Sequence, residues 1–199
     1  MQLGRMEILR QGNDGADYLT NGNEYRIFYG GIDSNSITQR ITDPNGIMAN
    51  IALRMANEMS CLATAHDFAQ DPSDRLLFPY AEIGFIPEDD NGFSVPAVND
   101  AIRANIQHLY DHVLGESYDL NDNEITEAYN LFVTIWKDGK NGVAAGTYSP
   151  DLGNCRASND YWTGADLAEN AITQDPDYTV RAWMGVLTYM LSDYKFLHE

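Results

Sequence analysis

The sequence lacks long apolar runs. Nothing in its 199 residues approaches the roughly 20 consecutive apolar residues that a helix needs to cross a bilayer. The first residues, MQLGRMEILRQ, also lack the apolar stretch of a signal peptide. We therefore expect no membrane span, in a chain that is either cytosolic or a mature or excised piece of a longer protein.

Basic residues are scarce. The chain has 12 Lys and Arg against 30 Asp and Glu, a net charge of −18. Such a surface repels phosphate backbones, which argues against a nucleic-acid partner. The imbalance is greatest in residues 86–127, which hold ten acidic residues and one basic residue, Arg103. An acidic surface mostly serves solubility; the alternative is that this face binds cations or a basic partner.

Cysteine is almost absent. Cys61 and Cys155 are the only two, and neither belongs to a CxxC or CxxCH pattern. Covalent c-type haem and Cys-rich zinc sites are therefore excluded within this chain. The residues leave two alternatives open, one long-range disulfide or two buried thiols. The chain also lacks GxSxG and the glycine-rich phosphate-binding patterns.

Helical periodicity dominates what is present. It predicts a single, mostly α-helical domain over residues 1–199, with about four main helices and long ordered loops. Residues 1–42 are expected to form an irregular segment packed on the domain, with at most a short hairpin around residues 25–29. The apolar stripes of the expected helices are Met55, Met59 and Leu62, then Ile102, Ile106, Leu109 and Val113, then Ile125, Tyr129, Phe132 and Trp136, and last Trp183, Leu187, Met190, Tyr194 and Leu197.

The expected helix ends follow from capping chemistry. Asp43-Pro44 and Asp175-Pro176 each place an acid before a proline, which predicts an N-cap and a first helical residue. Asn121 with Glu124 resembles a capping box. Gly115 and Gly139 are expected to end the second and third helices. The final helix is so broadly apolar that it either lies in the core, as we expect, or docks on another domain.

HLYDH at residues 108–112 is the strongest candidate for metal chemistry. His108 and His112 share one helix face, and Glu116 follows one turn later, so the three form a potential metal site. Zinc hydrolases of this type place a glutamate directly after the first histidine, where this chain has Leu109. Two partly exposed histidines without a metal are therefore the preferred interpretation, with a metal-dependent enzyme as the alternative.

His66 lies in line with an apolar stripe. A histidine there is usually a hydrogen-bonded core residue. The alternative is a haem-contacting role in electron transfer, because histidine and methionine are suitable haem-iron ligands. The sequence therefore predicts no particular cofactor and leaves a metal ion or a haem as alternatives.

Four stretches carry a resemblance: YGGIDSNSITQRITDPNGIMANIALRMANEMSC, DFAQDPSDRLLFPYAE, AIRANIQHLYDHVLGE and YTVRAWMGVLTYMLSDYKFLHE. In this order they resemble the C-terminal region of large, poorly characterised exported bacterial proteins that often carry c-type cytochrome segments elsewhere. The resemblance covers the chain from about Tyr29 to its end.

The resemblance implies a periplasmic or extracellular location and supplies no catalytic residues. It implies a fragment of a longer protein or a stand-alone relative. In an oxidising compartment we expect Cys61 and Cys155 to be bonded. The preferred function is a non-catalytic accessory or interaction domain of an exported protein, with a redox association, that contacts a protein partner or a neighbouring domain.

Overall fold

The computed structural model describes residues 39, 45–193, 195 and 196. They contain four α-helices, namely α2 (Gly46–Phe68), α3 (Pro96–Leu109), α4 (Asn123–Ala144) and α5 (Thr179–Leu191). A π-helical turn, η2 (Tyr110–Leu114), continues α3, and two 3-10 turns, η3 (Gly153–Cys155) and η4 (Ala168–Asn170), lie in the loop before α5. This part of the chain has isolated β-bridges but no strand, so the predicted mostly helical domain is confirmed. The expected N-terminal segment and hairpin lie outside the described residues.

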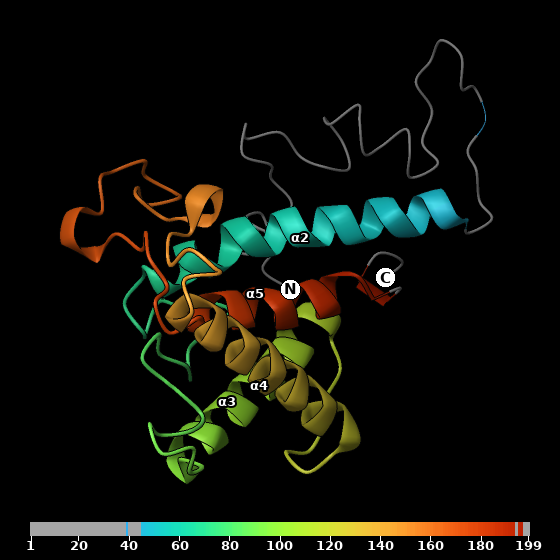
Figure 1. Cartoon of the computed structure of the whole chain (residues 1–199). Helices are drawn as coiled ribbons and strands as arrows, with labels where there is room; N and C mark the ends of the chain where they lie inside the picture. Colours follow the sequence, from blue (N-terminus) through green and yellow to red (C-terminus); the bar gives the residue numbers. More distant parts are fainter. Residues whose placement is uncertain (1–38, 40–44, 194, 197–199) are drawn as a thin grey trace.

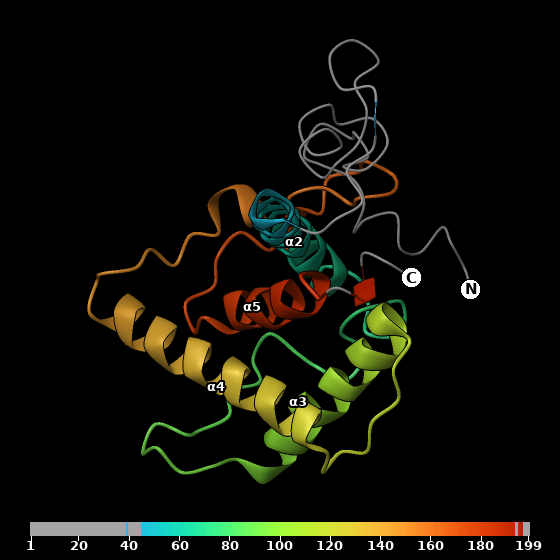
Figure 2. The same ribbon diagram turned by 90° about the vertical axis from the view of Figure 1, so that its right-hand side faces the viewer.

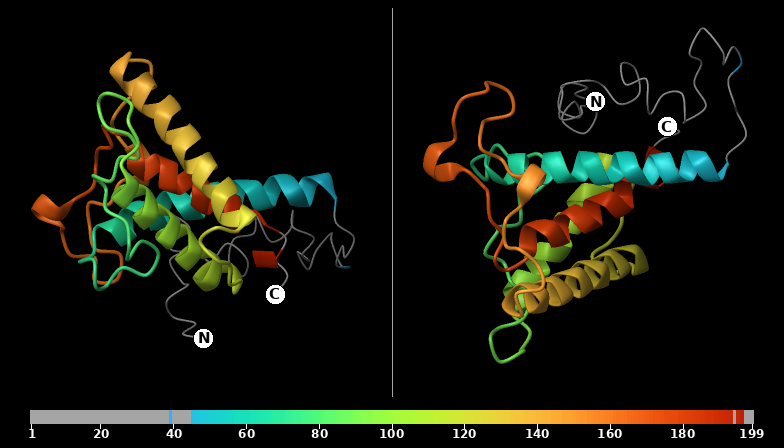
Figure 3. Two further views of the ribbon diagram at one scale, coloured as in Figure 1. Left: turned by 90° about the horizontal axis from the view of Figure 1, so that it is seen from below. Right: turned by 45° about the horizontal axis from the view of Figure 1, so that its top comes forward.

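Helix α5 is the centre of the arrangement. It packs against α2 on one side and against α4 on the other, and α4 also contacts α3. Figures 1 and 2 show α5 between α2 and the α3–α4 pair, and the right-hand view of Figure 3 shows the same three levels. The expectation that the final helix lies in the core is therefore correct. Nine of its 13 residues are buried, while Tyr189 is 47% exposed. Among the described residues, no helix has the length and apolar character of a membrane span.

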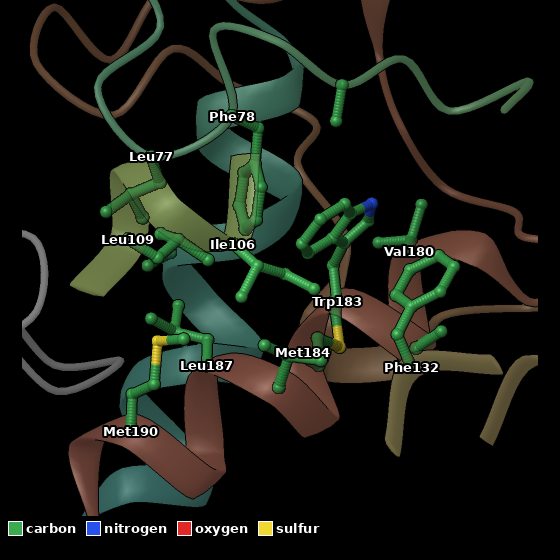
Figure 4. Close-up of a cluster of buried hydrophobic side chains, with 14 of the residues drawn as sticks. Leu77, Phe78, Ile106, Leu109, Phe132, Val180, Trp183, Met184, Leu187 and Met190 are labelled. Carbon is green, nitrogen blue, oxygen red and sulfur yellow. The ribbon is translucent and has the colours of Figure 1, made fainter. Parts of the chain in front are cut away.

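Trp183 lies in the middle of the apolar core (Figure 4). Its ring lies 5.2 Å from that of Phe78 and 4.7 Å from that of Phe132, measured between centroids. The largest fully buried side chains are Trp183, Phe78, Phe132, Met55, Ile102, Ile106, Leu109, Ile125, Leu187, Met190 and Leu191. Each contributes about 1.5–3 kcal/mol relative to an exposed position. Most residues of the predicted apolar stripes therefore lie in the core, with Tyr129 partly buried against it. Leu62 is only half-buried and does not belong to the core, and Tyr194 and Leu197 lie outside the described residues.

Small side chains set the distance between α2 and α5. Ala56, Ser60 and Ala63 are buried on one face of α2. The hydroxyl of Ser60 lies 2.7 Å from that of Thr188 on α5. Small residues at this spacing allow the two helix backbones to approach closely. The Ser60 hydroxyl also donates to the carbonyl of Asn57 at 3.0 Å, so this buried polar group is fully paired.

Two of the predicted helix starts are displaced. Helix α2 begins at Gly46, and the side chain of Asn45 accepts hydrogen bonds from the first amides, so Asp43 is not its cap. Asp43 and Pro44 lie outside the described residues. Helix α5 begins three residues after Pro176, yet the buried carboxylate of Asp175 accepts from two of its first amides at 3.1 and 3.0 Å. The predicted role of Asp175 is therefore correct, although its predicted position is wrong.

The predicted capping box at the start of α4 does not form. The helix begins at Asn123 after Asp122, and no side chain caps its first amides. Asp122 instead accepts a hydrogen bond from the backbone amide of Asp119, which closes the preceding turn. Gly115 has a positive φ of 67° and ends η2, as expected.

Gly139 does not end the third helix, because α4 continues to Ala144. A Cβ atom at Gly139 would overlap the ring of Tyr178, which packs directly on the helix backbone. Tyr178 itself has a positive φ of 61°, an unfavourable conformation for a non-glycine residue. Its ring is held between the backbone of α4 and the guanidinium of Arg181, 4.0 Å from the ring centroid. The glycine is therefore required by a close contact.

Cys61 on α2 and Cys155 in η3 lie at disulfide-bonding distance, with their Cα atoms 4.7 Å apart. The pairing joins residues separated by 94 positions. It attaches the loop between α4 and α5 to the C-terminal half of α2, where Figure 1 shows this loop in orange. The predicted disulfide pair is thus present in the structure.

Candidate functional site

A buried aspartate at the end of α2 organises the turn that follows it. The carboxylate of Asp67 accepts hydrogen bonds from the three consecutive backbone amides of residues 76–78, at 2.8, 3.0 and 2.9 Å. Burial raises the pKa of Asp67, and the three amides act in the opposite direction. Residues 76–78 lie outside any helix, and this carboxylate supplies the hydrogen-bond acceptor that their backbone amides need.

Two side chains of α3 hold the other side of the same turn. The buried amide of Asn105 donates to the carbonyl of Leu77 at 3.0 Å and accepts from the amide of Tyr80 at 3.1 Å. Nε2 of His108 lies 2.8 Å from the carbonyl oxygen of Leu76. Because a carbonyl only accepts, this nitrogen carries the proton. His108 therefore fixes the turn to the helix.

A hollow of about 280 Å³ opens between this turn, α3 and the segment after η2. It is lined by Tyr80, Ala104, Gln107, His108, Asp111, Ser117 and Tyr118. We call it the α3 pocket. Its far wall is anchored to the helix, because Gln107 donates to the carbonyl of Tyr118 at 2.6 Å and Ser117 donates to the carboxylate of Asp111 at 3.2 Å.

The lining of the α3 pocket contains one carboxylate and no lysine or arginine. Asp111 supplies a carboxylate whose side chain is 59% exposed. Burial lowers the pKa of His108, which keeps its imidazole neutral near pH 7; the hydrogen bond to the backbone of residue 76 opposes this shift. Lys195 does not line the pocket and forms an ion pair with Glu116. The carboxylate of Glu116 also accepts a hydrogen bond from the hydroxyl of Tyr118 at 2.8 Å.

The described residues do not bring His108, His112 and Glu116, the alternative metal site, together as one metal-binding group. The rings of His108 and His112 do meet, with centroids 4.0 Å apart and a tilt of 32°. Glu116, however, is held by Lys195 and by Tyr118, and these interactions lower its pKa. Across the described ranges, no three or more His, Cys, Asp or Glu side chains gather as a metal-binding group.

His66 holds the loop before α5 against α2. Its ring meets that of Tyr161 edge-on, with centroids 5.6 Å apart. Burial lowers the pKa of His66, and the negative charge of Asp160 acts in the opposite direction. Gln70, one turn further along α2, donates to the carboxylate of Asp160 at 3.0 Å. The ring of His66 thus contacts Tyr161, and His66 does not line the α3 pocket.

A second hollow, of about 500 Å³, runs between α2 and α5 beside the disulfide. Its walls include Cys61 and Cys155 together with Met184, Gly185 and Thr188. Gly185 faces α4, where a Cβ atom would overlap Ile135, so its lack of a side chain brings α4 close to α5. This hollow has mostly apolar walls, and His66 does not line it either.

Sequence reasoning identified His108 in the α3 pocket but not the residues around it. Tyr80 comes from a turn with no periodic signal, and the positioning aspartate, Asp67, precedes that turn by about ten residues. The one available signal was Asn105, a polar residue beside an apolar stripe, since a buried amide needs partners from another segment.

Comparison of the chain with protein-family models, with curated proteins and with solved structures found no match. We therefore base the functional proposal on the residues and on their arrangement.

Proposed function

We propose that this chain is a non-catalytic interaction domain of an exported bacterial protein, and that its acidic face binds a positively charged partner. By the acidic face we mean the ten acidic residues within residues 86–127. One observation carries the proposal. Within the described ranges, only Glu88, Asp90 and Glu116 of these acids pair with a lysine. Among the lysines and arginines that the structure describes, none pairs with the other seven: Asp89, Asp100, Asp111, Asp119, Asp122, Glu124 and Glu127.

Like charges that are close together in the chain and lack a described partner repel one another and destabilise the compact state. A partner of opposite charge relieves this repulsion, and its approach is accelerated by the long-range field. Because most of α5 is buried, the final helix offers less surface to a partner than the acidic face does.

One observation supports an exported location. The disulfide pair Cys61–Cys155 is of a kind that persists in oxidising compartments and is rare in the cytosol. The redox assembly as the setting of the partner is proposed on the sequence resemblance alone.

The experiment measures the affinity of the purified chain for an oligolysine peptide by titration calorimetry at increasing salt concentration. We compare the wild type with a face variant in which Asp100→Asn, Asp119→Asn and Glu124→Gln remove three exposed charges outside the α3 pocket. The proposal predicts that the face variant binds about tenfold more weakly, since each exposed charge contributes about 0.5 kcal/mol.

A matched control separates the acidic face from net charge. In the control variant, Asp71→Asn, Asp74→Asn and Glu169→Gln remove the same number of exposed charges elsewhere on the surface. We expect this variant to bind oligolysine nearly as well as the wild type. Equal losses in both variants would mean that the peptide responds only to net charge, and the proposal would then fail.

A further inference from the structure

We propose that the α3 pocket receives one cationic side chain of the partner, a lysine or an arginine. Asp111 is the counter-charge and the ring of Tyr80 is the aromatic face that the cation contacts. This inference rests on the proposed function, because it names the chemical group by which the partner would be held.

The lining of the pocket selects for positive charge. It combines one carboxylate, Asp111, with two phenol rings, Tyr80 and Tyr118, and with the imidazole of His108. A cation near an aromatic face is attracted by the negative face of the ring. A neutral imidazole does not repel it, and the pocket has no lysine or arginine of its own. An anionic ligand would meet only the carboxylate as a charged group.

The walls of the pocket are fixed before any ligand binds. Tyr80 is tied through its backbone amide to Asn105, and its ring packs edge-on against His108 with centroids 5.8 Å apart. Tyr118 is tied through its carbonyl to α3 and packs against the ring of Tyr110 at 5.0 Å. A site with anchored walls loses little conformational entropy on binding, and this favours affinity.

The size of the pocket suits a single side chain. Its volume of about 280 Å³ lies at the lower limit of small-molecule sites, which span about 300–1,000 Å³. Tyr80 is 57% exposed at its rim, although tyrosine is a residue that interfaces often bury as an anchor. The carboxylate of Asp111 connects the pocket to the acidic face. A side chain projecting from a docked partner therefore fits better than a large free ligand.

The test uses NMR titration of the full chain with two probes of the same shape. Nα-acetyl-lysine methylamide carries the ammonium, and Nα-acetyl-norleucine methylamide replaces it with an apolar end. We expect the lysine probe to shift the amide signals of Tyr80 and Tyr118, and the norleucine probe to bind at least about tenfold more weakly. Equal binding of the two probes would overturn the proposal.

Variants locate the interaction. Asp111→Asn should weaken binding of the lysine probe about tenfold. Asp100→Asn, which removes an exposed acid from the same helix outside the pocket, should change it little. Tyr80→Leu should weaken binding about threefold and Tyr80→Phe should not, because the ring and not the hydroxyl makes the contact. Equal effects of Asp111→Asn and Asp100→Asn would contradict the proposal that the lysine probe binds in the α3 pocket. The proposed function would still stand if the oligolysine test had succeeded.

A final comparison tests the source of the cation. The pentapeptide Gly-Gly-Lys-Gly-Gly presents the ammonium from a peptide chain, and spermidine presents it as a free amine. Tighter binding of the peptide per ammonium group supports a protein partner. Tighter binding of spermidine contradicts the protein partner and assigns the pocket to a small polyamine.

Discussion

Replacing His108 with alanine should destabilise the fold substantially. The change removes the hydrogen bond from Nε2 to the carbonyl oxygen of Leu76, which is 2.8 Å long. An unpaired, partly buried carbonyl costs about 1–3 kcal/mol. Loss of the buried part of the ring adds about 1 kcal/mol, and the better helix propensity of alanine returns about 0.5 kcal/mol. We therefore expect the free energy of unfolding to fall by about 1.5–3.5 kcal/mol.

His112→Ala is the matched control. It lies one turn from His108 on the same helix face, but its side chain is 55% exposed. We expect its substitution to change the free energy of unfolding by less than about 0.5 kcal/mol. Urea denaturation followed by circular dichroism measures both variants.

A metal site would give a different result. Two histidine ligands of one ion would have similar effects, and both substitutions would abolish any stabilisation by added zinc. A pair of equal losses, or a zinc-dependent rise in melting temperature that both variants lack, would refute the structural role given to His108.

Three further predictions concern stability. The paired substitution Cys61→Ser and Cys155→Ser should lower the free energy of unfolding by about 4–5 kcal/mol, because the disulfide closes a loop across 94 positions. Thiol titration of the denatured wild type should find no free thiols, and two would contradict the disulfide. Gly139→Ala should lower the melting temperature despite its better helix propensity, because overpacking costs about 1–3 kcal/mol; a higher melting temperature would contradict the tyrosine contact. His66 and His108 have folded-state pKa values below their ordinary value, so the unfolded chain binds more protons and stability should fall as pH drops below about 6.5. The urea midpoint should therefore be lower at pH 5.5 than at pH 7.5, and a higher midpoint would show the sign to be wrong.

The helices could be predicted because their apolar residues recur at helical spacing. Ile102, Ile106 and Leu109 all lie in the core, as does Trp183 of the final helix. Helix ends were harder to predict, since they depend on neighbours. Gly139 has the usual composition of a helix end, but a ring that is distant in sequence packs on it and the helix continues.

The candidate site could be predicted only in part. HLYDH drew attention to the correct helix, but the partner of His108 is a backbone carbonyl in a turn 32 residues away. Nothing in the local sequence identifies such a partner, because every residue has a carbonyl. This turn also depends on Asp67. Its carboxylate accepts hydrogen bonds from the amides of residues 76–78 only after the chain has folded back on α2.

The central claim is that the acidic face and its α3 pocket bind a cationic partner. The most direct measurement is a titration of the ¹⁵N-labelled chain with a lysine-containing basic peptide, followed by amide chemical shifts at low and at high salt. The account predicts that the largest shifts fall on Tyr80 and on residues 104–118, and that they weaken as salt is added. Shifts concentrated on the hollow beside the disulfide, or shifts that do not depend on salt, would contradict it.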